Sequence, residues 1–312
     1  MKKPLDPKAK ALLTAIAMAG VPNLAELPPV VAREEVDKGY ARMKIPVVPV
    51  HSVRDYLIPG AVNDIQVRVY HPENQGLLPV IIYFHGGGWV FFHLDAYDPI
   101  CTHLCVAAGC IVVSVEYRLA PENKYPAATD DCLEATKWVA GHLEHWNGNP
   151  SAIFLAGDSA GANLATVTAM RIRNEGGPAI RGQVLLYPVT DYFNPERPSY
   201  IEFAEDYGLT RDAMKWYWNQ YLTTEKDAQD PGVAPLREPD LSDMPAALVM
   251  IAAYDPLRDE GLAYAKRLQE AGVEVYLSVY EDMIHAFLSY LGILQQAHLA
   301  IEEIAGWIKR HP

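Results

Sequence analysis

Gly157-Asp158-Ser159-Ala160-Gly161 stands between an apolar run, residues 152–156, and a segment of helix-forming composition, residues 162–171. The run before it predicts a buried strand, and the segment after it predicts a helix. The two glycines and the small Ala160 permit a turn so tight that bulkier residues would collide with the strand and the helix. Such a turn leaves the Ser159 hydroxyl at the carboxyl end of the strand, close to a helix N-terminus that favours negative charge. The pattern predicts a strand–turn–helix unit that presents a nucleophilic serine.

Apolar runs and helical segments alternate along the chain on both sides of this unit. Two short alternating runs on either side of Pro59-Gly60 predict an antiparallel hairpin, at residues 53–58 and 65–70. Further near-continuous apolar runs predict strands covered on both faces, at 80–84, 111–116, 152–156, 183–187, 247–252 and 273–279. The intervening segments predict helices, at 98–108, 128–145, 258–271 and 295–309. This alternation indicates the α/β class, with helices on both faces of a mostly parallel sheet.

Two segments fall outside the alternation. Residues 1–45 carry no strand signal and predict two helices joined by the proline-rich segment 21–29. Residues 190–240 form a long insertion that contains an amphipathic helix with an aromatic face, at residues 210–218. We expect both segments to pack over another part of the molecule.

Charge and composition exclude several classes of partner. The 312 residues carry a formal net charge of −13 and show no cluster of lysine and arginine, which argues against nucleic acid and anionic membrane surfaces. No apolar run is long enough to predict a transmembrane helix. The basic N-terminal residues before the apolar run 11–21 resemble a signal peptide, but Pro4, Asp6 and Pro7 interrupt them, so we expect a packed helix instead.

The four cysteines, Cys101, Cys105, Cys110 and Cys132, fit neither a zinc-binding spacing nor a disulfide framework. We therefore expect buried free thiols, no bound metal and a reducing, cytoplasmic location.

The sequence His85-Gly86-Gly87-Gly88-Trp89 follows the first predicted parallel strand. Three consecutive glycines cost backbone entropy, and a strand before them and a bulky ring after them favour a fixed turn over a flexible loop. We interpret the amides of Gly87 and Gly88, with that of Ala160, as an oxyanion hole for a tetrahedral intermediate. His85 is expected to brace this turn by hydrogen bonds.

An acid and a base follow two later strands of the predicted sheet. Asp255 comes after the strand at 247–252, and His285 comes after the strand at 273–279. The carboxyl ends of parallel strands meet at one edge of a sheet, so both side chains are expected beside Ser159. The order serine, aspartate, histidine suits a catalytic triad on such a sheet, because the imidazole takes the serine proton and the carboxylate steadies the imidazolium. Asp191 and Asp282 remain alternative acids.

Taken together, these motifs resemble the bacterial hormone-sensitive-lipase-like family of carboxylesterases. The resemblance extends from about residue 81 to residue 287 and rests on His85-Gly86-Gly87-Gly88-Trp89, Tyr117-Arg118-Leu119-Ala120-Pro121-Glu122, Gly157-Asp158-Ser159-Ala160-Gly161, Leu186-Tyr187-Pro188, Asp255-Pro256-Leu257-Arg258-Asp259-Glu260 and His285.

The resemblance implies an α/β-hydrolase fold with an eight-stranded, mostly parallel sheet and a helical cap. It places the cap in residues 1–45 and 190–240 and the hydrolase core in residues 46–189 and 241–312. It also implies hydrolysis of small-molecule carboxylic esters without metal or organic cofactor, and a possible homodimer through the last strand.

Four positions depart from the family's usual pattern. The family usually has glycine near the positions of Phe92, Ala162, Asp282 and Ala286. None of these residues belongs to the expected triad, so the departures bear on the shape of the pocket and the preferred substrate.

Aromatic residues are the only sequence evidence on the substrate. We expect Trp89, Phe92, Phe203, Tyr207 and Trp216 to bind it, with Phe91, Tyr217 and Trp218 as further candidates for the pocket wall. So many rings restrict the pocket, which predicts small to medium acyl chains.

Two other functions remain open. The same triad can act on an amide, carbamate or lactone. Plant hormone receptors related to this family are non-catalytic, but they lack the histidine that stands here as His285. Haloalkane dehalogenation requires an aspartate nucleophile. This chain has Ser159 at that position, which argues against dehalogenase activity.

Overall fold

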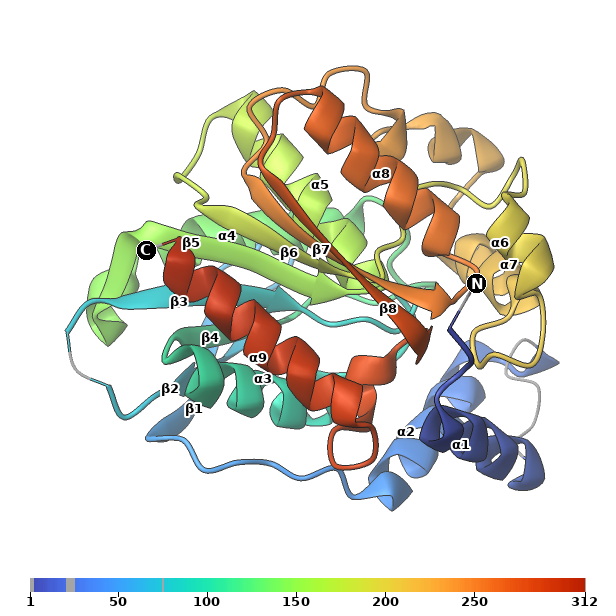
Figure 1. Cartoon of the computed structure of the whole chain (residues 1–312). Helices are drawn as coiled ribbons and strands as arrows, with labels where there is room; N and C mark the ends of the chain where they lie inside the picture. Colours follow the sequence, from blue (N-terminus) through green and yellow to red (C-terminus); the bar gives the residue numbers. More distant parts are fainter. Residues whose placement is uncertain (1–2, 21–25, 75, 312) are drawn as a thin grey trace.

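Strand β5 (Gly148–Asp158), which ends in the Ser159 turn, lies in the middle of an eight-stranded sheet. The structure is a computed structural model that describes residues 3–20, 26–74 and 76–311 (Figure 1). Within these residues the strand order is β1-β2-β4-β3-β5-β6-β7-β8. The other strands are β1 (Ser52–Ile58), β2 (Ile65–His71), β3 (Leu78–Phe84), β4 (Ile111–Glu116), β6 (Gly182–Leu186), β7 (Ala246–Tyr254) and β8 (Val275–Ile284).

Only the pairs that involve β2 are antiparallel. β2 runs antiparallel to β1 and to β4, whereas every pairing among the strands β3 to β8 is parallel. The register aligns Gly157 with Phe84 on one side and with Leu185 on the other, so β3, β5 and β6 end at the same edge. The predicted hairpin, the mostly parallel eight-stranded sheet and the α/β-hydrolase fold are thereby confirmed.

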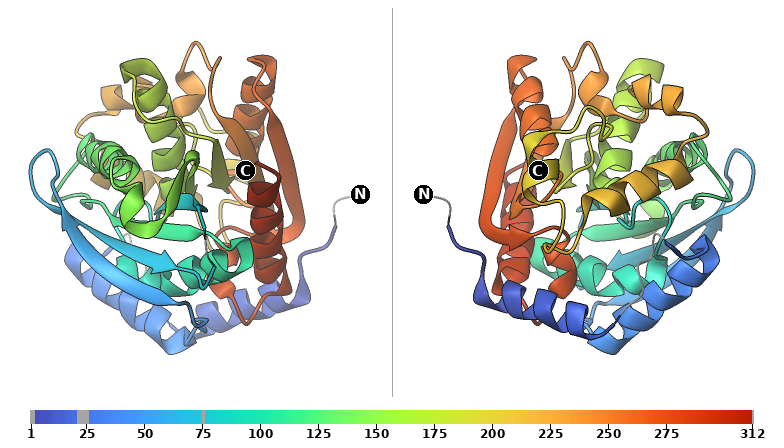
Figure 2. Two further views of the ribbon diagram at one scale, coloured as in Figure 1. Left: turned by 90° about the vertical axis from the view of Figure 1, so that its left-hand side faces the viewer. Right: turned by 90° about the vertical axis from the view of Figure 1, so that its right-hand side faces the viewer.

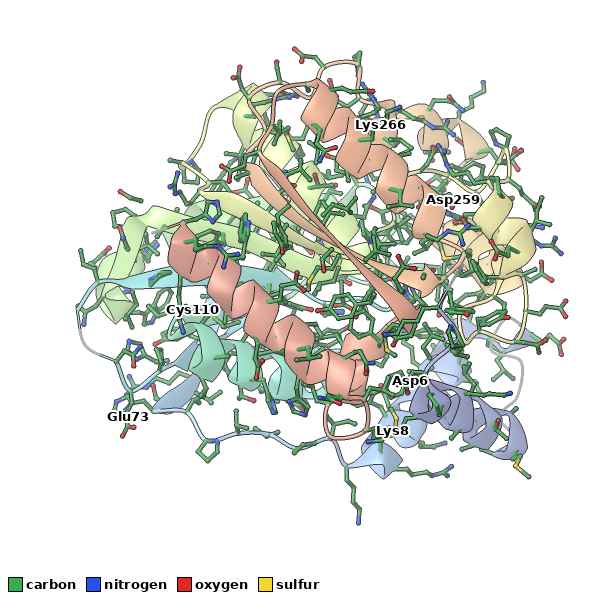
Figure 3. All side chains as sticks on the ribbon, viewed as in Figure 1. Asp6, Lys8, Glu73, Cys110, Asp259 and Lys266 are labelled. Carbon is green, nitrogen blue, oxygen red and sulfur yellow. The ribbon has the colours of Figure 1, made fainter. Side chains whose placement is uncertain are left out.

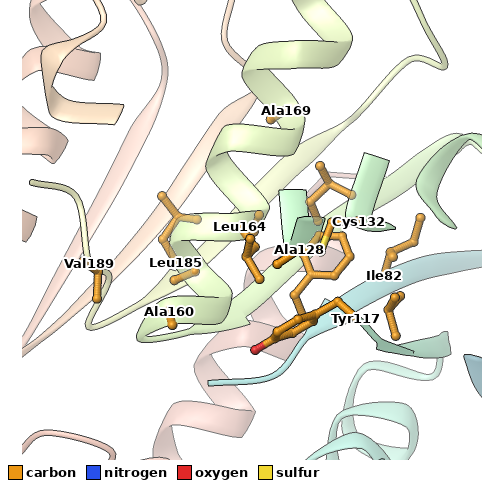
Figure 4. Close-up of a cluster of buried hydrophobic side chains, with 14 of the residues drawn as sticks. Ile82, Tyr117, Ala128, Cys132, Ala160, Leu164, Ala169, Leu185 and Val189 are labelled. Carbon is orange, nitrogen blue, oxygen red and sulfur yellow. The ribbon is translucent and has the colours of Figure 1, made fainter. Parts of the chain in front are cut away.

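Helices cover both faces of the sheet (Figure 1). One face carries α3 (Leu94–Ala108) and α9 (Gln295–Arg310), and the other carries α4 (Ala127–Ala140), α5 (Ala160–Glu175) and α8 (Arg258–Glu270). Figure 4 shows the second layer, where Ile82 and Leu185 of the sheet meet Cys132 of α4 and Leu164 of α5. The expected helix at 128–145 is shorter than predicted, because it ends at Ala140 and a separate 3₁₀ turn follows at Leu143–Trp146.

One strand departs from the predicted burial. The first seven residues of β8 are exposed or half-buried, and Tyr276, Leu277 and Val279 are among the exposed large apolar side chains. The prediction of coverage on both faces is wrong for this strand. A strand at the end of a sheet has one neighbour only, so the flanking helices leave part of its surface in contact with solvent. A homodimer through this edge stays a prediction.

Within the part of the chain that the structure describes, four α-helices lie outside the layered core. They are α1 (Pro7–Met18), α2 (Pro29–Met43), α6 (Pro198–Glu202) and α7 (Arg211–Tyr221). Figure 2 shows α1 and α2 at the same end of the molecule, with their axes at an angle to each other. Residues 21–25 of the predicted linker between them lie outside the described residues. The division into cap and core segments stays a prediction, which the position of these helices supports.

Polar contacts fix the two N-terminal helices to the core. Asp6 caps α1 by accepting hydrogen bonds from the backbone amides of Lys8 and Ala9 (Figure 3), and its own amide donates to the carbonyl of Asp282. On α2, the Arg33 guanidinium donates to the carbonyl of Val90 at 2.7 Å, just after the glycine loop. Both helices are therefore attached close to loops of the expected site.

All four cysteines are buried free thiols, as predicted. Cys110, for example, lies under α9 (Figure 3). Among the residues that the structure describes, none of the helices has the length and apolar character needed to cross a bilayer.

Candidate active site

Ser159 has a backbone conformation that few residues adopt. It lies between β5 and α5 with φ +54° and ψ −119°, and its amide donates a hydrogen bond of 2.9 Å to the carbonyl of Leu186. Such a conformation costs on the order of 1–3 kcal/mol and persists only where the surroundings enforce it. A Cβ on Gly161 would collide with the carbonyl oxygen of Phe84, and one on Gly157 would collide with Gly161. The two glycines are thus required by contact with neighbouring backbone, as the sequence predicted.

The structure brings the three predicted triad side chains together. With the imidazole proton placed on Nδ1, the Ser159 hydroxyl donates to His285 Nε2 at 2.9 Å, and His285 Nδ1 donates to Asp255 Oδ2 at 2.7 Å. The other carboxylate oxygen of Asp255 accepts the amide of Leu257 at 2.8 Å. The three side chains follow β5, β7 and β8, and each is at most 9% exposed. In this apolar setting a serine, an imidazole and a carboxylate have the contacts that proton transfer from the hydroxyl requires.

Neither alternative acid contacts the imidazole. Asp191 accepts hydrogen bonds of 2.7 Å from both Arg197 and Arg237, which occupy its two oxygens. Asp282 forms an ion pair with Lys3 near the N-terminus. The carboxylate that contacts His285 is that of Asp255.

The glycine loop lies beside the serine. Gly87 and Gly88 have φ values of +104° and +61°, which favour glycine, and both line the same cavity as Ser159. A Cβ on Gly88 would collide with the ring of Tyr217, so this close approach also excludes larger residues. The assignment of the Gly87, Gly88 and Ala160 amides as an oxyanion hole stays a prediction.

A buried carboxylate joins this loop to the serine turn. Asp158 Oδ1 accepts the amide of Gly86 and the hydroxyl of Tyr83, both at 3.0 Å, and Oδ2 accepts the hydroxyl of Tyr97 at 3.0 Å. Burial raises the pKa of the Asp158 carboxyl to about 6. Sequence reasoning missed this role, because the pentapeptide gives no sign of the residues that Asp158 contacts.

His85 braces the start of the loop. Its ring stacks on Tyr117 with centroids 4.2 Å apart, and Nδ1 lies 2.8 Å from the carbonyl oxygen of Gly86. Burial lowers the pKa of this imidazole to about 4, so it is neutral at physiological pH. A buried neutral ring held by its neighbours fits the bracing role that we expected.

The triad opens into a cavity of about 510 Å³. Its walls come from the glycine loop, the His285 loop and the helices α1, α2 and α7, including Leu12, Ala15, Ile16, Val36, Tyr40, Met43, Trp89, Phe92, Tyr97, Val189, Met214, Tyr217, Ala286 and Tyr290. The size lies within the range of small-molecule sites, and the mostly apolar lining suits the hydrocarbon part of a ligand.

The structure corrects part of the predicted pocket. Trp89 and Phe92 line the cavity, but Phe203, Tyr207 and Trp216 do not. Phe203 and Tyr207 pack against each other and against Tyr254, and Trp216 stacks on Phe91. On α7 the face that meets the cavity carries Met214 and Tyr217, three residues apart, so Trp216 points along another face.

Other wall residues were missed by sequence reasoning. Val36, Tyr40 and Met43 of α2 recur at the spacing of one helix face, and this periodicity was the signal that could have found them. Tyr97 and Tyr290 gave no comparable signal, because each lies in a segment whose apolar residues also pack in the core.

Comparisons with known proteins agree with this geometry. A family model described as "alpha/beta hydrolase fold" matches residues 81–289. The chain belongs to the hormone-sensitive-lipase-like family of α/β-hydrolases.

Three relatives of this α/β-hydrolase illustrate the similarity. Esterase LipI of Mycobacterium tuberculosis is 40% identical over 81% of this chain and 80% of its own length. An ethyl acetate hydrolase of Pseudomonas putida is 36% identical over 80% and 79%. The solved structure of a hyperthermophilic esterase from the archaeon Pyrobaculum calidifontis is 38% identical, with a TM-score of 0.95 over 99% of both chains.

Two of the positions that depart from the hydrolase family's usual glycine have positive φ. Phe92 has φ +75°, and Ala286, directly after His285, has φ +58°. A left-handed conformation costs a non-glycine residue on the order of 1–2 kcal/mol. Ala162 is buried in the first turn of α5, and Asp282 pairs with Lys3. This hydrolase therefore keeps a strained backbone on both sides of its cavity.

Within residues 3–20, 26–74 and 76–311, no group of three or more His, Cys, Asp or Glu side chains is arranged so that it could hold a metal ion.

Proposed function

We propose that this α/β-hydrolase is a serine carboxylesterase that hydrolyses esters with small to medium acyl chains through an acyl-enzyme intermediate. The observation that carries the proposal is the continuous chain of hydrogen bonds from Ser159 Oγ through the His285 ring to Asp255. Membership of the hydrolase family and the esterase names of its relatives support the same reaction class.

In the proposed mechanism, Ser159 Oγ attacks the ester carbonyl while His285 Nε2 takes its proton. Asp255 holds the proton on Nδ1 and stabilises the imidazolium that forms. The amides of Gly87, Gly88 and Ala160 receive the negative charge on the carbonyl oxygen, an effect that is typically worth several kcal/mol. The imidazolium then protonates the departing alcohol. In the second half of the reaction, His285 takes a proton from a water molecule that attacks the acyl-enzyme, and it returns that proton to Ser159 as the carboxylic acid is released.

The cavity supports the expected substrate size. A volume of about 510 Å³ with apolar walls suits a short hydrocarbon chain on either side of the ester. The Pseudomonas putida relative is named as a hydrolase of a small ester, ethyl acetate, which supports a small ester as the substrate of this chain.

The test is a series of p-nitrophenyl esters from acetate to palmitate, with Ser159→Ala as the control for background hydrolysis. We expect kcat/KM to peak between butyrate and octanoate, and Ser159→Ala to reduce the rate at least a thousandfold. A fluorophosphonate probe should label one serine, identified by peptide mass as Ser159. Activity that survives Ser159→Ala, or a faster rate on the matched anilide than on the ester, would overturn the proposal.

A further inference from the structure

Phe92 combines a strained backbone with a place in the wall of the cavity. Its φ of +75° lies in the left-handed region, where a bulky aromatic residue is an outlier, and its ring lines the cavity that contains Ser159. Strained residues persist where neighbouring structure enforces them, and they gather at ligand sites. The position therefore calls for an explanation in terms of the ligand.

We propose that Phe92 is a specificity-determining residue that closes the cavity beside the glycine loop, so that the enzyme selects esters with an unbranched group on that side. The proposal rests on the proposed esterase function and narrows its substrate class.

Contacts from three elements hold the ring in place. Its Cδ2 lies 2.7 Å from where a Cβ on Gly87 would stand, so the ring packs directly on the predicted oxyanion loop. On other sides it meets Tyr40 of α2 and Tyr97 of α3 edge to face, with centroids 5.6 and 5.8 Å away. Edge-to-face packing of this kind is favourable for aromatic rings.

This wall cannot easily yield to a larger substrate. The Tyr97 hydroxyl is fixed by the buried Asp158 carboxylate and also accepts the amide of Gly86 at 2.8 Å. Moving the Phe92 ring toward Tyr97 would disturb that hydrogen-bonded cluster, and moving it toward Gly87 would push on the glycine loop itself. A branch or ring on the substrate therefore meets packed aromatic carbon and cannot be accommodated by a small shift.

The φ angle explains how the ring reaches this place. At positive φ the side chain leaves the backbone in a direction that an ordinary residue does not use, so the conformation aims the ring into the cavity. Glycine would relieve the strain and open the space, whereas alanine would open the space and keep the strain. Phe92→Gly and Phe92→Ala should therefore enlarge the cavity alike, whereas only Phe92→Gly should relieve the backbone strain.

The experiment compares Phe92→Gly, Phe92→Ala and Phe92→Leu with the wild type. Substrates form two arms: p-nitrophenyl butyrate against isobutyrate, pivalate and benzoate, and n-butyl acetate against sec-butyl, tert-butyl and phenyl acetate. The first arm varies the acyl group and the second varies the alcohol group. In the arm whose varied group lies against Phe92, we expect the branched-to-linear ratio of kcat/KM to rise at least tenfold in the Gly and Ala variants and by a smaller factor in the Leu variant. One methyl group in an apolar pocket typically changes this ratio ten- to two-hundredfold. Phe92→Gly should also melt at a higher temperature than Phe92→Ala.

Two control variants isolate the cause. Asn147→Gly relieves a φ of +57° outside the cavity, and Phe193→Ala removes a phenyl ring that does not line it. Both should keep the wild-type ratios. Unchanged ratios in both arms, in folded Phe92 variants that still hydrolyse n-butyl and butyrate esters, would overturn the inference and leave the esterase function intact. Loss of the proposed function itself would instead appear as activity that survives Ser159→Ala.

Discussion

Replacing Asp255 with asparagine tests the triad most directly, because it changes one atom and leaves the volume of the side chain almost unchanged. In the wild type both carboxylate oxygens accept an N–H group, Oδ2 from His285 and Oδ1 from the amide of Leu257. Asparagine offers one acceptor and one donor. Two N–H groups at 2.8 Å would repel each other, so the asparagine oxygen should stay with the amide of Leu257 and its NH₂ should face the imidazole.

That arrangement forces the imidazole into the wrong tautomer. Nδ1 must then accept a hydrogen bond, which moves the ring proton to Nε2, 2.9 Å from the Ser159 hydroxyl. A protonated Nε2 cannot take the serine proton. We expect kcat to fall about ten-thousandfold, equivalent to about 5.5 kcal/mol of transition-state stabilisation, with KM within a few-fold of the wild type.

The assay measures steady-state hydrolysis of p-nitrophenyl butyrate, with circular dichroism to verify folding. Asp191→Asn is the matched control, since Asp191 is also a mostly buried aspartate but contacts Arg197 and Arg237. It should lower the melting temperature and leave kcat within a few-fold. The reasoning is refuted if folded Asp255→Asn retains a tenth of wild-type turnover, or if folded Asp191→Asn loses turnover instead.

Three further changes probe the surroundings of the site. Burial raises the pKa of Glu260 from 4.5 to about 8, so the contribution of this carboxyl to the free energy of unfolding should fall by several kcal/mol as pH rises from 4.5 through 8; urea denaturation at several pH values should show that the stability of the wild type relative to Glu260→Gln falls over this range. Arg33→Ala removes the hydrogen bonds from α2 to the core, and should lower the free energy of unfolding by about 2 kcal/mol and raise KM. Gly161→Ala puts a methyl group onto the carbonyl oxygen of Phe84 and should prevent soluble expression, whereas Gly306→Ala on α9, where there is room, should be tolerated.

Several parts of the fold were predictable because local pattern and long-range packing agree. Apolar runs marked the strands, and the pentapeptide around Ser159 marked the strained serine turn. The order of Ser159, Asp255 and His285 along strand ends predicted their meeting, since parallel strands bring their carboxyl ends to one edge. The burial of strand β8 was predicted wrongly. Its apolar residues suggest a strand covered on both faces, but β8 is the last strand of the sheet and is partly exposed.

Periodicity gave less information about the cavity wall. The aromatic face of the helix at 210–218 suggested Trp216, with Tyr217 and Trp218 as further candidates, and of these three Tyr217 is the one that lines the cavity. A helix with several aromatic residues has more than one apolar side, and only its rotation against the core selects which side meets the ligand.

By itself, the sequence determined the fold class, the strained serine turn and which carboxylate and imidazole side chains would meet Ser159, because each depends on residue type and on position relative to a strand. Only the tertiary structure decided which aromatic residues line the cavity of the serine, that Asp158 links the serine turn to the glycine loop, and that Phe92 has a positive φ in the cavity wall. These features depend on contacts between segments far apart in the chain, and their energies depend on distances that no local pattern encodes.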